Sequence, residues 1–185
     1  EALLLKLTKW MYEKQFAITG RLLGEGYEPE MFYAVEPSIQ MYIAEKSEAL
    51  RELYVSSYSY AATANYIHQM ATDKLVELFG AMHPQYTRQD FYELELATSG
   101  MVRSFMARKC DRNFTMEQKL RRFLSCSMTI YGVAEEKQQQ VIDRVLEMDL
   151  KSVADQLVAD AIHQADEQYQ EAERKGKAIE AARNG

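Results

Sequence analysis

The spacing of apolar residues along the chain is helical rather than strand-like. Apolar positions recur every three or four residues, as in Tyr60, Ala64, Ile67, Ala71 and Leu75, and no stretch alternates apolar and polar residues as a strand would. Glycine and proline number only 8 and 3, so few residues interrupt the helices. The pattern predicts an all-α protein, an antiparallel helical bundle of about eight helices.

Breaks between the apolar runs give the expected helix limits. We expect helices over residues 1–23, from 29 past 43, after Ser47, and over 60–79, 87–109, 115–131, 134–148 and from about 153 onward.

Several residues at these limits have the chemistry of helix ends. Ser47 can cap the helix that follows it, and Thr87 and Thr115 each precede a polar residue by three positions, as in a capping box. Gly132 suits the left-handed position after a helix. Pro37 lies inside the second helix, and we expect it to kink that helix or divide it in two.

Apolar residues become rare near the end of the chain. Residues 1–165 therefore read as one helical domain, and residues 166–185 as a solvated helix that frays into a tail. At 185 residues, such a chain can bury roughly 70% of its unfolded surface without disulfides or metals.

The overall charge argues against a surface that wraps nucleic acid. The formal net charge is −6, whereas phosphate binding needs clustered Lys and Arg. Short basic clusters, such as the one containing Lys119, are expected to be solvated helix faces. No apolar run is long enough for a membrane span. Cys110 and Cys126 have no metal-site or redox-motif spacing, which favours a reducing cytoplasm.

No catalytic or metal-binding pattern is found. The three histidines, His68, His83 and His163, lack the Glu-x-x-His spacing of di-iron bundles, so we expect no metal and no cofactor. Neither a nucleophile elbow nor a glycine-rich phosphate loop occurs. We therefore expect that the protein is not an enzyme.

Tyrosine and methionine are abundant, at 12 and 10 residues. Tyrosine needs a partner for its hydroxyl when its ring is buried, and methionine fills irregular spaces. Tyr58 lies close in sequence to Asn65 and His68, so a mostly apolar pocket with a few polar groups is one interpretation. Burial of the same residues in the core and at the rim of a bundle is the other.

The helices expected over 87–109 and 115–131 carry apolar residues on more than one side. Such a helix is either central in its own chain or shared with a second subunit. Small residues at 99–100 and at 125 and 127 would allow close approach of another helix. Both interpretations stay open from the pattern alone.

These features, in this order, resemble the C-terminal domain of the TetR family of transcriptional regulators. Residues 1–16 look like the helix that connects the family's N-terminal DNA-binding head to its ligand-binding domain. Residues 45–60 look like a short helix after an acid-rich turn, and 97–110 with 116–132 are similar to the last two dimer-forming helices. The resemblance lies in helix order over about residues 1–132, and the chain continues past the point where many members stop.

The resemblance implies a homodimer that binds a small apolar or aromatic effector and binds DNA only through an N-terminal head absent from these 185 residues. Binding of the effector would tilt the first helix and change the separation of the two heads. The candidate ligand-binding residues are Phe16, Tyr58, Asn65, His68 and Phe105. The candidate dimer residues are Met101, Phe105, Leu120, Phe123, Leu124, Ser127 and Tyr131.

A helical adaptor without a DNA-binding head is the alternative. Such a protein would bind a partner protein through its acidic C-terminal helices. A regulator is expected to have a deep pocket between helices, whereas an adaptor is expected to have an exposed apolar groove.

Overall fold

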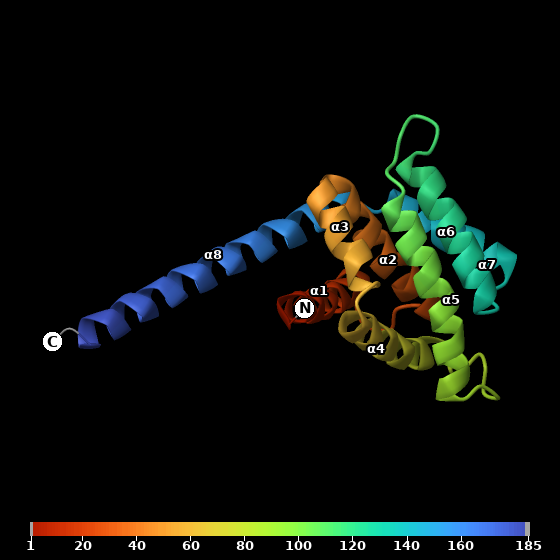
Figure 1. Ribbon diagram of the computed structural model, residues 1–185. Helices are drawn as coiled ribbons and strands as arrows, with labels where there is room; N and C mark the ends of the chain where they lie inside the picture. The colour runs from red at the N-terminus through yellow and green to blue at the C-terminus, as the bar shows by residue number, and fades with distance from the viewer. Residues whose placement is uncertain (1, 184–185) are drawn as a thin grey trace.

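The computed structural model describes residues 2–183, and the side chains of these residues except 168, 172, 176 and 178–183. Within this range the chain is all-α, as predicted, and forms a bundle of eight helices (Figure 1). They are α1 (Ala2–Leu23), α2 (Pro29–Lys46), α3 (Glu48–Ser57), α4 (Ala61–Phe79), α5 (Arg88–Ala107), α6 (Met116–Ile130), α7 (Glu135–Glu147) and α8 (Leu150–Arg183).

The predicted helix caps are confirmed. Ser47 accepts a hydrogen bond from the Leu50 amide at the start of α3. Thr87 and Thr115 each form a complete capping box, the first with Asp90 and the second with Gln118. These contacts satisfy amide groups that have no partner inside the helix. After α6, Gly132 adopts a φ of 72°, which favours glycine.

Helix α2 is the centre of the bundle, because it contacts every other helix. Most of its residues are buried, including the run from Ala34 to Met41. Its apolar residues point in all directions, as expected for a helix enclosed on every side. Pro37 does not divide α2, although it offers no N–H to the carbonyl group of Tyr33 four residues earlier.

Helix α8 has a packed part and a projecting part. Its first turns pack on α2, with Leu150, Ala154 and Leu157 buried. The rest extends away from the bundle (Figure 1). The region predicted as a solvated, fraying tail begins at 166. It is helical through Arg183, and residues 184–185 lie outside the described part of the chain.

Lys119 is buried, which contradicts its assignment to a solvated face. Its ammonium group donates a hydrogen bond to Glu45, 2.8 Å away, and another to the carbonyl group of Arg108. Glu45 also accepts a bond from the Cys110 amide. The pairing compensates the cost of burying the charge and fastens the loop before α6 to α2.

No helix within residues 2–183 has both the length and the apolar character needed to cross a membrane.

Candidate functional site

A cavity lies inside the bundle, between α1, α2, α4 and α5. Its inner space open to the centre of a water molecule is about 70 Å³, and its whole empty volume, mouth included, is about 570 Å³. A single water needs only about 10–15 Å³ by the first measure, so the space exceeds one water. We call it the central cavity. Its walls are Tyr12, Phe16, Phe32, Tyr33, Glu36, Pro37, Gln40, Tyr58, Ile67, Ala71, Lys74, Leu75, Leu78, Glu95, Thr98, Ser99, Val102 and Phe123.

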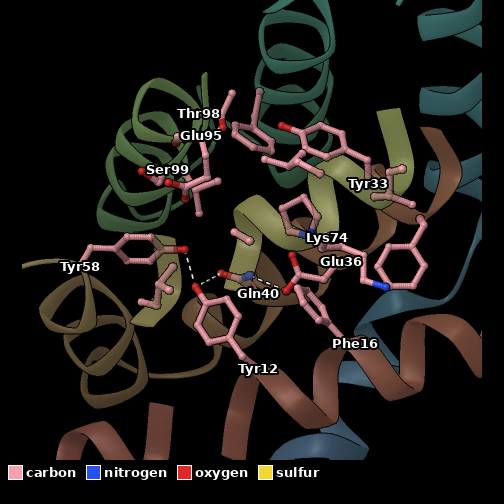
Figure 2. A pocket seen from close by; sticks show the side chains of 18 residues that line it. Tyr12, Phe16, Tyr33, Glu36, Gln40, Tyr58, Lys74, Glu95, Thr98 and Ser99 are labelled. Atoms are coloured by element: carbon pink, nitrogen blue, oxygen red, sulfur yellow. Dashed lines mark hydrogen bonds between the residues drawn. The ribbon is translucent and has the colours of Figure 1, made fainter. Parts of the chain in front are cut away.

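A chain of hydrogen bonds crosses one side of the central cavity. The hydroxyl groups of Tyr12 and Tyr58 bond to each other, and Tyr12 also donates to Gln40 at 3.5 Å. The Gln40 amide donates to the Glu36 carboxyl group at 2.6 Å. Figure 2 shows these four side chains in a row, contributed by α1, α2 and the end of α3. They fix polar groups in an otherwise apolar space, as small-molecule sites require.

Glu36 is the most unusual of these groups. Its side chain is buried in the middle of α2, and no basic residue in the described chain forms an ion pair with it. Burial disfavours the charged form and raises the pKa of the carboxyl group to about 7, although the bond from Gln40 opposes the rise. Near neutral pH, Glu36 is therefore present in both its protonated and its ionised form.

A second carboxyl group, that of Glu95, reaches the central cavity from α5. It contacts the Nδ1 atom of His68 on α4 at 2.7 Å. Burial is the largest influence on the pKa of Glu95 and raises it, while His68 lowers it. Thr98, also in the wall, bonds through its hydroxyl group to that of Tyr131 at 2.7 Å.

One ammonium group also reaches the central cavity, on the side of Glu36 (Figure 2). The Nζ atom of Lys74 is 4.8 Å from the ring centroid of Phe32 and 5.7 Å from that of Phe16. It also bonds to Glu77 at 2.8 Å, on the outer side of α4. The rings of Phe16 and Phe32 therefore already form a surface that attracts a cation.

The structure places two of the five candidate ligand-binding residues in the cavity wall, Phe16 and Tyr58. His68 lies behind Glu95 and acts on the cavity only through it. Asn65 is exposed on α4 and is not part of the wall. Phe105 packs against Phe123 and Phe114, at ring-centroid distances of 5.7 and 6.4 Å, and is also outside the wall.

Five of the seven candidate dimer residues are buried inside the single chain: Leu120, Phe123, Leu124, Ser127 and Tyr131. In this conformation they offer no surface to a second copy, because α6 turns this face toward the bundle. Its outward face carries polar residues such as Glu117, Gln118 and Arg122. Met101 and Phe105 on α5 are half-buried and keep some exposed surface.

Sequence reasoning missed most of the polar residues of the cavity, among them Tyr12, Glu36, Gln40 and Glu95. A signal for two of them existed in the second helix. Glu36 and Gln40 are polar residues one turn apart within an almost continuous apolar stretch, and a helix of that composition is buried on all sides. Glu95 carried no such signal, since the fold alone brings it to the cavity.

No group of three or more His, Cys, Asp or Glu side chains that could hold a metal ion occurs in the described part of the chain. Cys110 is half-buried and Cys126 exposed, and both are free thiols. Burial raises the pKa of Cys110, which favours the less reactive thiol form.

A second hollow, wider and more open, lies between α1, α3 and the first half of α8. Its space open to the centre of a water molecule is about 500 Å³. We call it the outer groove. Most of its wall is apolar, and two side-chain atoms in it are buried without a hydrogen-bond partner, the indole N–H of Trp10 and the Oε1 atom of Gln15. Its walls are Leu7, Trp10, Met11, Lys14, Gln15, Ile43, Lys46, Ser47, Leu50, Leu53, Tyr54, Leu157, Val158, Ala161, Ile162 and Ala165.

Comparison with known proteins found no matching family model, no matching curated protein and no matching solved structure. The function must therefore be inferred from the residues of this chain.

Proposed function

We propose that this chain is the effector-binding and dimerisation part of a ligand-responsive transcriptional regulator of the TetR type, acting in the cytoplasm and without catalytic activity. The observation that carries the proposal is the position of the central cavity against α1. Tyr12 and Phe16 of α1 form part of its wall. In the resembling family, the corresponding helix leads to the DNA-binding head.

Coupling between the cavity and α1 follows from the contacts of Tyr12. Its hydroxyl group bonds to Tyr58 at the end of α3 and to Gln40 on α2. An effector that takes one of these bonds changes what holds α1 to the bundle. If α1 can take two positions, the effector favours one of them only to the extent that it binds that form more tightly than the other.

In a dimer, a tilt of α1 would change the distance between two heads. The heads must lie about 34–36 Å apart, or a multiple of it, to enter successive major grooves. The negative charge of this chain fits a division of labour in which a separate head supplies the positive DNA-binding surface.

The test uses the product of the complete reading frame that encodes this chain. That protein is incubated with random DNA fragments, and the bound sequences are enriched and read. We expect paired half-sites about one helical turn apart, and a sedimentation profile of a dimer. Failure to enrich any sequence, or a monomer at micromolar concentration, would overturn the proposal.

A companion test addresses the central cavity. Small molecules are screened by the shift in melting temperature that they cause, and each hit is repeated on Tyr58→Ala. The matched control is Tyr60→Ala, because Tyr60 is 52% exposed and lies outside the cavity. Hits weakened by Tyr58→Ala alone place the ligand in the cavity. If both variants lose the melting-temperature shift equally, or neither loses it, Tyr58 is not part of the ligand site.

The outer groove favours a second candidate function, an adaptor that binds a helix of a partner protein. Its open apolar wall, formed by residues such as Leu50, Leu53 and Ile162, has the character of a groove that receives an amphipathic helix. An adaptor predicts that the complete gene product enriches no DNA, and that Ile162→Asp abolishes binding of a partner protein purified with it.

A further inference from the structure

The charged groups of the central cavity differ in what they are bound to. Lys74 is paired with Glu77, and Glu95 is paired with His68. Glu36 has only the amide of Gln40, which is uncharged. Glu36 is therefore the one carboxyl group in this wall that has no basic side chain in contact with it among the residues described.

The uncharged part of the wall is rich in aromatic rings. In Figure 2, Phe16 and Tyr33 lie on the side of Lys74 and Glu36, and Tyr12 and Tyr58 lie across the space. Phe32 also lines the cavity. Ring faces attract cations, and they do so more strongly where water is excluded. The Lys74 ammonium group over Phe16 and Phe32 demonstrates this attraction within the same wall.

We propose that the central cavity binds an organic cation, a substituted ammonium group paired with the Glu36 carboxylate and surrounded by the aromatic rings of the wall. This inference rests on the proposed function in one respect, that the cation serves as the effector. The apolar body of the ligand would lie toward Ile67, Leu75 and Leu78.

The alternative ligand of opposite charge is an organic anion paired with Lys74. Two observations disfavour it. Lys74 already has Glu77 as a partner, and an anion would be placed in the same small space as two carboxyl groups, Glu36 and Glu95. Like charges in a buried site repel strongly.

The dependence of binding on pH distinguishes the two ligands. A cation needs ionised Glu36, whose pKa is about 7, so its affinity rises with pH between 6 and 8. The other ionisable groups around Glu36 are Tyr12 on α1, Tyr33 on α2, Tyr54 and Tyr58 from α3, Lys74 on α4 and Glu95 on α5.

The tyrosine neighbours, Tyr33 included, do not change charge below pH 8. Burial raises the pKa of Tyr12, Tyr54 and Tyr58 well above the usual range of tyrosine, so these hydroxyl groups stay neutral at pH 8. Burial also raises the pKa of Glu95, so the Glu36→Gln variant is what assigns the pH dependence to Glu36. Helix α6 contributes Phe123, which does not ionise, and α7 and α8 contribute nothing to the wall.

The experiment measures binding by isothermal titration calorimetry with benzyltrimethylammonium and tetramethylammonium, whose charge is permanent. The matched neutral ligand is neopentylbenzene, in which carbon replaces nitrogen, and the matched anion is phenylacetate. We expect the aromatic cation to bind about tenfold or more tightly than either. Equal affinity for the neutral ligand, or binding of neither cation, would overturn the proposal.

Two variants sharpen the result. Glu36→Gln keeps the shape and removes the charge, and we expect it to weaken cation binding about tenfold or more and to abolish its pH dependence. Glu52→Gln on the exposed side of α3 is the matched control and should bind as the parent does. Melting curves establish that both variants fold. Unchanged cation binding by folded Glu36→Gln contradicts the assignment.

The same ligands separate this inference from the proposed function. Cation binding without DNA enrichment by the complete gene product would leave the cation site standing and exclude the regulator. DNA enrichment with no cation binding would leave the regulator standing and exclude the cation site.

Discussion

The central cavity and the outer groove share one wall, helix α1, yet they differ in almost every property that governs recognition. The cavity is small and holds polar groups fixed by a chain of hydrogen bonds from Tyr58 to Glu36. The groove is wide and mostly apolar, and its buried polar atoms on Trp10 and Gln15 lack partners. Fixed polar groups select a ligand by its charge and shape, whereas an open apolar surface selects chiefly by area.

The two sites also differ in their relation to the core. The cavity wall consists of core residues, so its shape depends on the packing of the whole bundle. One side of the groove is α8, which is the last helix and has one face in solvent. Changes in the cavity should therefore affect stability, and changes in the groove should affect mainly its own surface.

The greatest difference in stability between the two sites should appear when one isoleucine of each wall is truncated. Ile67 lines the cavity and is 1% exposed, and Ile162 lines the groove and is 58% exposed. Ile67→Ala should lower the free energy of unfolding by about 2–5 kcal/mol, because it removes buried methyl groups and leaves a void. Ile162→Ala should change it by less than about 0.5 kcal/mol. Urea denaturation measures the free energy of unfolding of both variants. Equal losses would contradict the inference that the cavity wall is part of the core and the groove wall is not.

The next effect concerns Glu36 and pH. Its pKa in the folded protein, about 7, lies above the ordinary value of 4.5. Between these two values the folded chain holds a proton that the unfolded chain has released, so stability falls as pH rises through this window. The full fall corresponds to up to about 3 kcal/mol. Glu36→Gln should remove it.

The measurement is chemical denaturation at pH 4, 6 and 8 for both proteins. We expect Glu36→Gln to match the parent at pH 4 and to exceed it progressively toward pH 8. A variant that is less stable than the parent at pH 8 would mean that the carboxylate has a compensating partner in the fold.

A smaller effect separates the surfaces of the two sites. Nile red, a neutral apolar dye, should fluoresce when it binds the outer groove. Ile162→Asp introduces a charge there and should reduce the fluorescence severalfold, while Glu36→Gln should leave it unchanged. A loss of fluorescence in Glu36→Gln but not in Ile162→Asp would mean that the dye binds in the central cavity instead.

The smallest effect concerns how α8 is held against the groove. Lys46 on α2 forms an ion pair with Asp155 on α8, and both side chains are partly exposed. Exposed pairs contribute about 0.2–1 kcal/mol, so Asp155→Asn should lower the free energy of unfolding by that amount, and less at high salt. Thermal melts at 0.05 and 1 M salt check this, and a loss independent of salt would contradict it.

Most of the fold could be predicted from the sequence because its signals are local. The capping boxes that begin with Thr87 and Thr115 and the glycine at 132 are complete within four residues, so the chain specifies those helix ends by itself. The splitting of α2 at Pro37 was predicted as one possibility and did not occur, because surrounding helices hold α2 together.

The candidate site was harder to predict, since it depends on which helices become neighbours. Phe16 and Tyr58 were identified from residue type, while Glu95 reaches the cavity only because α5 packs beside α4. Five of the seven residues predicted for dimerisation are buried in the single chain instead, for a related reason. Leu120 and Phe123 belong to an apolar face whose pattern is the same whether its partner lies in the same chain or in another.

The enclosure of α2 has a consequence for the synthesis of this protein. When the ribosome completes Lys46, the helix that will contact every other helix has only α1 beside it. Its apolar surface is not fully covered until the residues of α7 and the first turns of α8 emerge, on the order of ten seconds later at ordinary rates of translation. Until then the nascent chain exposes apolar surface on α2, so its maturation depends on what shields that helix outside the exit tunnel.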